Sequence, residues 1–125
     1  MSSYRASLLE QHLLDKVLRY TRNASDSDYS GGGWFEEVNY ALYLHRDKSF
    51  YYRIETFRNI RGGGFSLPQE HLRELGGRWE VRWEAPAIKL VLYVNDGRVL
   101  SWATEDAGNG LQRMDEMLWN RYRQH

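Results

Sequence analysis

Alternation of apolar and charged side chains is the feature of this sequence that most limits its fold. In residues 78–84 every second side chain is charged, and tryptophan or valine lies between (Trp79, Val81 and Trp83). A period of two matches a β-strand, whose successive side chains point to opposite faces, and does not match a helix. The same period runs through residues 35–45 and 50–57. The chain therefore predicts several half-buried strands.

Short turn sequences separate these strands. Arg46-Asp47-Lys48 lies between the first two, Ala85-Pro86-Ala87 precedes a β-rich run at residues 88–94, and Asn95-Asp96-Gly97 follows that run. Asn and Asp-Gly tolerate the positive φ angles of a tight hairpin turn. Connections this short join antiparallel neighbours, because parallel strands need a crossover of a dozen or more residues. We therefore expect an antiparallel meander over about residues 34–104.

The segment before the meander has a helical spacing of leucines. Ser7 and Glu10 have the spacing of a capping box. We expect a helix over about residues 8–22, although residues 16–22 also fit a first strand. Residues 23–33 collect small polar side chains and three glycines, which predicts a loop.

Two further segments have short helical signals. Residues 66–69 form a second capping box that contains Pro68, and predict one or two helical turns before Gly76-Gly77. Residues 104–110 read as a polar turn. Residues 111–123 fit two interpretations, a terminal helix or a closing strand, and both stay open.

The composition indicates one globular domain spanning residues 1–125. A chain of this size buries roughly two-thirds of its unfolded surface, so it needs no covalent staples. The absence of cysteine excludes disulfides and thiol nucleophiles and fits a reducing compartment. With 17 basic and 17 acidic side chains, a nucleic-acid partner is not expected. Without a signal sequence or a long apolar run, we expect no membrane partner and a cytoplasmic protein.

The order of the segments resembles the small lipocalin-like β-meander domains of bacteria. An apolar strand leads into residues 44–52, and a glycine-rich loop, Gly76-Gly77-Arg78-Trp79 and the hairpin at residues 90–99 follow. The resemblance covers about residues 34–104. It implies an up-and-down barrel or half-barrel whose interior can hold a ligand, in a class with more binding modules and accessory domains than enzymes. Unlike secreted lipocalins, this chain has no cysteine, and we expect no signal peptide.

Aromatic side chains dominate the predicted inward face, and they have two interpretations. Such rings fill a packed core, which is the commoner role, or they line a pocket. In a pocket, tyrosine hydroxyls and indole N–H groups would suit a planar or amphipathic organic molecule. The candidate ligand-binding residues are Tyr40, Tyr52, Trp79, Trp83 and Trp102.

Residue types that serve catalysis or metal binding form no recognisable motif. The four histidines lack the spacing of a metal-binding pair. Adjacent carboxylates such as Glu36 and Glu37 point to opposite faces of a strand. The triple glycines lack the Gly-Lys-Ser/Thr of a phosphate-binding loop. We therefore expect no metal, no cofactor and no catalytic residue.

These observations together predict a mainly β domain, an antiparallel up-and-down meander that forms a small barrel or half-barrel, with an N-terminal helix. The function we expect is a non-catalytic binding or interaction module. Its partner is a small organic ligand or a protein, including a second copy of the chain, held at an aromatic-lined barrel or its rim. One alternative is a small enzyme with acid/base chemistry near His71 and Glu70. Another is an inhibitor or immunity-type protein that acts through Trp34, Phe35 and Tyr43.

Overall fold

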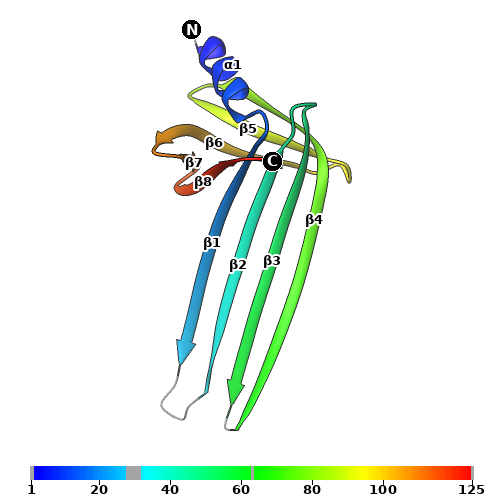
Figure 1. The fold of residues 1–125 in the computed structure, drawn as a ribbon, viewed down its shortest axis with the longest axis vertical. Helices are drawn as coiled ribbons and strands as arrows, with labels where there is room; N and C mark the ends of the chain where they lie inside the picture. Colours follow the sequence, from blue (N-terminus) through cyan, green and yellow to red (C-terminus); the bar gives the residue numbers. More distant parts are fainter. Residues whose placement is uncertain (1, 28–31, 63, 125) are drawn as a thin grey trace.

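The chain closes into an eight-stranded barrel preceded by one helix (Figure 1). This computed structural model describes residues 2–27, 32–62 and 64–124. The elements are α1 (Ser2–Leu13), β1 (Lys16–Ser27), β2 (Gly33–Leu44), β3 (Ser49–Gly62), β4 (Phe65–Glu84), β5 (Ala87–Val94), β6 (Val99–Gly108), β7 (Leu111–Met114) and β8 (Met117–Arg123). Consecutive strands pair antiparallel, and β8 returns to pair with β1. The predicted up-and-down barrel with an N-terminal helix is confirmed.

The helix predicted at residues 8–22 has the wrong bounds. α1 ends at Leu13, and β1 begins at Lys16 after Asp15, whose φ of 60° turns the chain. Ser7 lies inside α1 and does not cap it. The strand interpretation of residues 16–22 is the correct one, because β1 pairs with both β2 and β8 where the barrel closes. Pairing on both sides outweighs the helical spacing of Val17 and Leu18.

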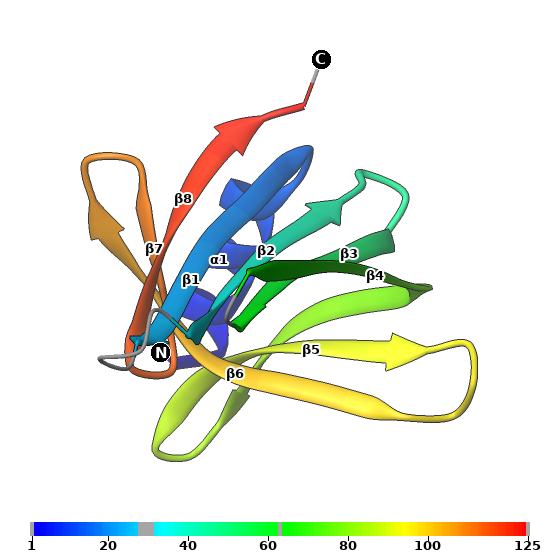
Figure 2. The same ribbon diagram turned by 90° about the horizontal axis from the view of Figure 1, so that it is seen from below.

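Four of the strands continue well beyond the barrel. β8 pairs with β1 only over residues 16–19, and β5 pairs with β4 only from Gly77 onward. The remaining parts of β1–β4 form a four-stranded sheet that leaves the barrel at the end opposite α1 (Figures 1 and 2). We call this sheet the extension; it comprises residues 20–27, 33–40, 54–62 and 65–73. Its two outer strands, β1 and β4, have free edges.

The extension replaces a predicted helix and part of a predicted loop. β4 runs unbroken through residues 66–77, where the sequence predicts helical turns, and it pairs with β3 throughout. Pro68 is compatible with this strand because β4 is an edge there, where proline is tolerated. β1 includes residues 23–27 of the predicted loop, whereas residues 28–31 lie outside the described residues.

The C-terminal segment is a pair of strands, so the helical interpretation of residues 111–123 is wrong. β7 and β8 meet at a turn in which Asp115 has a φ of 55°. β6 also continues to Gly108, through most of the turn predicted at residues 104–110. Without β7 and β8, the sheet would remain an open half-barrel, because they connect β6 to β1.

The inward parity predicted for the meander is confirmed. The buried core residues include Leu42, Leu44, Phe50, Tyr52, Trp79, Val81, Leu90 and Leu92. Because cross-strand partners share a face, this parity continues along the extension. The side of the extension that is continuous with the barrel interior is its inner face, and the other side is its outer face.

Candidate functional site

Five aromatic rings gather at the end of the barrel where the extension begins. Tyr40, Tyr52 and Trp102 were expected to share a face, and the structure brings them together with Tyr20 and Trp119. Ring centroids of neighbours lie 5.7–6.4 Å apart, and Tyr20 stacks on Trp119 with an interplanar angle of 22°. We call this group the mouth cluster (Tyr20, Tyr40, Tyr52, Trp102 and Trp119).

Burial differs between members of the mouth cluster. Tyr52 and Trp119 are 4% and 2% exposed, whereas the other three are only partly buried. In the strand register, Tyr20 pairs with Tyr40 directly beyond the buried pair Leu18 and Leu42. The cluster therefore combines two buried rings with three partly exposed ones, and the inner face of the extension continues from it.

Sequence reasoning missed Tyr20 and Trp119. Tyr20 lies in the segment expected to be helical, and Trp119 lies in the segment with two interpretations. The alternation of Leu18 and Tyr20 was a usable signal once residues 16–22 are read as a strand. No local signal could place Trp119 beside Tyr20, because that contact depends on the pairing of β1 with β8 that closes the barrel.

Polar atoms in the mouth cluster lack protein partners. The indole N–H of Trp119 is buried and finds no acceptor among the described residues. Gln112 is the cross-strand partner of Trp119, but both the nitrogen and the oxygen of its side-chain amide already form hydrogen bonds with other residues. The amide donates to Thr104 Oγ1 at 2.7 Å and accepts from Arg121 Nη1 at 2.8 Å.

The phenol groups of the cluster are equally unpaired. Among the described residues, the hydroxyls of Tyr20, Tyr40 and Tyr52 and the indole N–H of Trp102 form no hydrogen bond, although Tyr43, Tyr51 and Tyr93 on the outside of the sheet do. Burial, followed by the nearby phenol of Tyr40, raises the pKa of Tyr52, and the positive charge of Arg73 acts in the opposite direction. Tyr52 is thus a neutral hydrogen-bonding group at physiological pH.

An unpaired buried donor costs free energy. The typical penalty is about 1–3 kcal/mol, so native proteins rarely keep such groups without an acceptor from solvent or a ligand. A group of aromatic rings with apolar faces and several free hydrogen-bonding atoms has the composition of a small-molecule site. Such rings can stack on a planar molecule, and their free O–H and N–H groups can donate to its acceptor atoms.

Trp79 lies away from the mouth cluster, at the end of the barrel covered by α1. Its ring is 2% exposed, its indole N–H donates to the backbone carbonyl of His45 at 3.0 Å, and the Lys48 ammonium lies 4.0 Å from the ring centroid. The ring is thus packed on all sides and hydrogen-bonded. The structure gives Trp79 the environment of a core residue.

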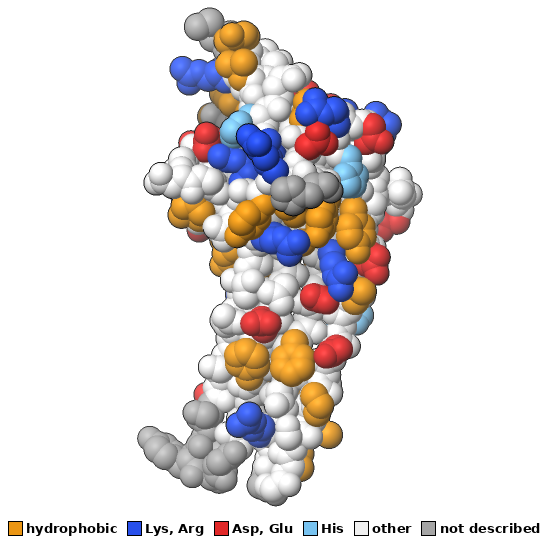
Figure 3. All heavy atoms as spheres, in the orientation of Figure 1, with side chains coloured by type: hydrophobic (Ala, Val, Ile, Leu, Met, Phe, Trp, Pro, Cys, Tyr) orange, Lys and Arg blue, Asp and Glu red, His pale blue; other side chains and the backbone are white. Residues whose placement is uncertain are grey.

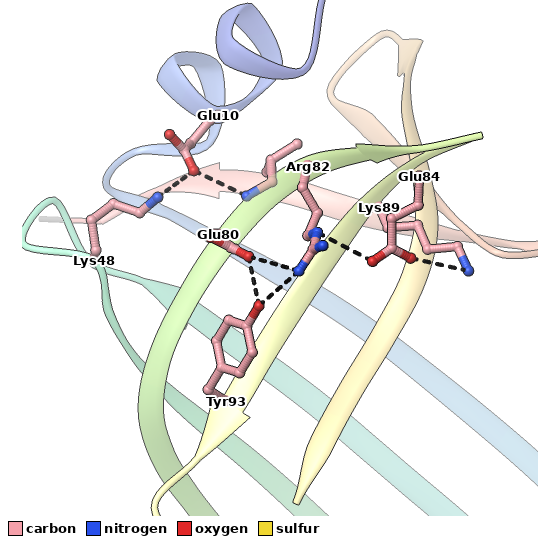
Figure 4. A network of polar contacts seen from close by, with 8 residues as sticks. Glu10, Lys48, Glu80, Arg82, Glu84, Lys89 and Tyr93 are labelled. Carbon is pink, nitrogen blue, oxygen red and sulfur yellow. Dashed lines mark hydrogen bonds and ion pairs between the residues drawn. The ribbon is translucent and has the colours of Figure 1, made fainter. Parts of the chain in front are cut away.

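Polar contacts attach α1 to this end of the barrel (Figure 4). The Glu10 carboxylate accepts from the Lys48 ammonium and from the backbone N–H of Val81 at 3.0 Å. A second network lies on the outside of β4 and β5, where Tyr93 donates to Glu80 at 2.6 Å and Arg82 contacts Glu80 and Glu84. The Lys89 ammonium lies 3.8 Å from Glu84 and completes the second network. Both networks then have equal numbers of positive and negative groups, which is typical of structural contacts.

Trp83 lies at the rim of the same end and is 39% exposed. It lines a hollow of about 410 Å³ with Arg5 of α1 and Asp115 of the β7–β8 turn, among other residues. Trp83 therefore belongs neither to the packed core nor to the mouth cluster. The five residues predicted as one site are divided by the structure among three environments.

The residues of the enzyme alternative lie on the free edge of the extension. His71 was predicted on a short helix, but it lies on β4 directly after Glu70. Successive strand residues point to opposite faces, so the two side chains do not converge on one substrate. Among the described residues, no group of three His, Cys, Asp or Glu side chains is placed to hold a metal ion.

The residues of the inhibitor alternative are also divided by the sheet. Trp34 lies on the inner face, where it lines a hollow of about 490 Å³ with Glu36, Arg58 and Ile60. Phe35 lies on the outer face, with its ring centroid 6.5 Å from that of Phe57. Figure 3 shows this outer face, where hydrophobic and acidic side chains alternate along the extension. Exposed apolar groups thus occur on both faces and form no single patch.

Within the described residues, no helix has the length and apolar character needed to cross a membrane. Comparison with known proteins adds no relative. No protein-family model, curated protein or solved structure matches this chain.

Proposed function

We propose that this protein is a non-catalytic, lipocalin-like binding module of the bacterial cytoplasm that holds a small planar or amphipathic organic molecule at the mouth cluster. The observation that carries the proposal is the buried indole N–H of Trp119, which has no acceptor among the described residues. A ligand acceptor atom at this position would remove the penalty of the unpaired donor. The unpaired hydroxyls of Tyr40 and Tyr52 supply further hydrogen bonds.

The architecture supports a ligand at this end of the barrel. At the opposite end, α1 and the buried Trp79 fill the interior. At the mouth, the rings of Tyr20, Tyr40 and Trp102 are partly exposed. Ligand sites in small barrels occur at such mouths, because the barrel itself is only wide enough for side chains or one small ligand.

The binding proposal has better geometric support than the enzyme alternative. An enzyme needs titratable groups that converge on the reacting atoms. Glu70 and His71 point to opposite faces of an edge strand, whereas the mouth cluster converges without them. A protein partner on the outer face of the extension is a separate role that the same chain can combine with ligand binding.

Indole N–H resonances provide a direct test. The chain has five tryptophans, each with one indole N–H signal in a ¹H–¹⁵N spectrum. The probe is naphthamide, a neutral planar compound with an acceptor oxygen. We expect saturable shifts of the Trp119 and Trp102 signals. The Trp79 signal is an internal control, because its N–H already donates to His45.

A pair of tyrosine variants separates specific binding from adsorption to the surface. Tyr40→Phe removes a hydroxyl of the mouth cluster, and Tyr43→Phe removes one from the outer side of the same strand, where it accepts from Arg19. We expect weaker naphthamide binding for Tyr40→Phe only, by about five- to tenfold, which is the typical value of one hydrogen bond. Equal affinities for both variants, or no shift of Trp119 in the parent protein, would contradict the proposal.

A further inference from the structure

The inner face beside the mouth cluster carries a positive charge that has no partner among the described residues. Arg73 lies on β4 opposite Ile54, in the same cross-strand row as Tyr20 and Tyr40. The next row toward the barrel contains Tyr52 and Leu75. Among the described residues, Arg73 makes neither an ion pair nor a hydrogen bond.

The other charges nearby are already paired. On the inner face, Glu36 accepts from Arg58 at 2.6 Å and lies 3.7 Å from Arg22. Glu74 follows Arg73 in the strand and therefore points to the outer face, where it accepts from the Tyr51 hydroxyl at 3.1 Å. Asp26 is also on the inner face, but it pairs with Trp34, three cross-strand rows from Arg73. Among the described residues, no carboxylate forms an ion pair with Arg73.

Most arginines of this sheet do find a carboxylate. Arg53 contacts Glu55 at 2.7 Å, Arg82 contacts Glu84 at 3.1 Å and Arg113 contacts Glu105 at 2.8 Å, all on cross-strand or same-strand neighbours. Arg73 differs in its position next to a group of unpaired hydrogen-bond donors. A guanidinium beside phenol and indole donors is a suitable environment for an anion, because all of these groups donate.

We infer that the molecule bound at the mouth cluster is an anion, an aromatic or amphipathic carboxylate whose charged group pairs with Arg73 while its apolar part lies against the rings. This inference rests on the proposed function and specifies its ligand class. The guanidinium can approach a carboxylate with two parallel N–H donors, which sets the orientation of the ligand. The Trp119 N–H and the Tyr52 hydroxyl then remain free to donate to other acceptor atoms of the ligand.

The test compares two probes of nearly the same size and shape, the anion naphthoate and the neutral naphthamide. Because Arg73 is exposed and its attraction is screened by solvent, we expect naphthoate to bind on the order of fivefold more tightly at low salt. Raising the ionic strength to about 1 M, where the Debye length is about 3 Å, should remove most of this difference. Calorimetric titration and the Trp119 indole shift both measure the affinities.

A matched pair of arginine variants assigns the effect to one side chain. Arg73→Gln should abolish the preference for naphthoate over naphthamide. Arg78→Gln is the control. Arg78 is an exposed arginine on the same strand and has no ion pair with any described residue, but its side chain lies on the outer side of the sheet. It should leave both affinities unchanged.

The outcomes distinguish this inference from the proposed function. If naphthamide binds at Trp119 and naphthoate binds no more tightly, the ligand class is wrong while the binding site stands. If neither probe shifts Trp119, both proposals fail. A preference for naphthoate that survives in Arg73→Gln would also overturn the role of Arg73. Both substitutions lie on exposed strand positions, where we expect the variants to fold. Thermal unfolding verifies that each variant is folded.

Discussion

Truncation of Trp79 and Trp83 should have very different costs, although the two side chains share a face of one strand. A fully buried tryptophan removes about 200 Å² from water, worth ~5 kcal/mol at 25 cal/mol per Å². Trp79 is 2% exposed, so its burial contributes nearly all of this free energy. Trp79→Ala also removes one of the two donors to the His45 carbonyl, which still accepts from the backbone N–H of Lys48, and it removes the ring beneath the Lys48 ammonium.

The two losses set the expected magnitudes. For Trp79→Ala we expect a decrease in the free energy of unfolding of about 4–6 kcal/mol, a large part of the ~5–15 kcal/mol that stabilises a typical domain. Trp83 is 39% exposed, so the same calculation gives at most ~3 kcal/mol. At the rim, water and neighbouring side chains can occupy the space, so no closed cavity adds to this cost. We expect about 1–2 kcal/mol for Trp83→Ala.

Urea unfolding followed by circular dichroism measures both values. Trp79→Phe keeps most of the ring volume but removes the indole N–H, so its free energy of unfolding should lie between those of the parent protein and Trp79→Ala. It should remain folded even if the alanine variant does not. Equal losses for the two alanine variants, or a larger loss for Trp83→Ala, would refute the assignment of Trp79 to the core and of Trp83 to the rim. The sequence alone favours a large loss at both positions, because it places both rings on the inward parity.

Three further outcomes follow from local geometry. Gly97→Val should cost about 1–3 kcal/mol in urea unfolding, because Gly97 has a φ of 96° that a β-branched residue adopts only with strain; an unchanged midpoint would show that this turn is not strained. Gly77→Ala should strongly destabilise the protein, because a Cβ at this position would lie 1.9 Å from a backbone oxygen of β5. Gly76→Ala should be tolerated, because the atom nearest to its Cβ would be 3.6 Å away. Melting temperatures compare the two variants, and equal effects would contradict the close approach at Gly77. Burial, followed by the Arg121 charge, lowers the pKa of His12, so the unfolded chain binds more protons and stability should decrease as the pH falls from about 6.5 through the lowered pKa. His12→Gln should flatten this part of the stability profile, and an unchanged slope would assign it to other groups.

The sequence predicted the parts of the fold that depend on local patterns. The alternation at residues 78–84 places Trp79 and Val81 inward, and both are buried. The Asn95-Asp96-Gly97 turn connects β5 and β6 as expected. Such features can be read from the chain because side-chain alternation and positive φ angles are properties of a few neighbouring residues.

Local patterns failed where two interpretations had similar strength. Residues 16–22 and 111–123 have spacing that suits a helix or a strand, and both are strands because they pair with each other to close the barrel. The capping-box pattern at residues 66–69 was overruled by pairing with β3 along the whole of β4. Hydrogen bonds to a distant strand, together with shared burial, outweigh preferences of less than about 1 kcal/mol per residue.

The candidate site was identified only in part. The sequence indicated that the candidate ligand-binding residues are aromatic side chains on the inward face, and it predicted Tyr40, Tyr52 and Trp102 among them. Only the tertiary structure added Tyr20 and Trp119, removed Trp79 and Trp83, and placed Arg73 beside the rings. Side-chain periodicity determines the face on which a residue lies, but its height in the barrel depends on strand register and on which strands meet. Those are set by contacts between residues far apart in the chain, and they decide which aromatic rings fill the core and which surround the mouth.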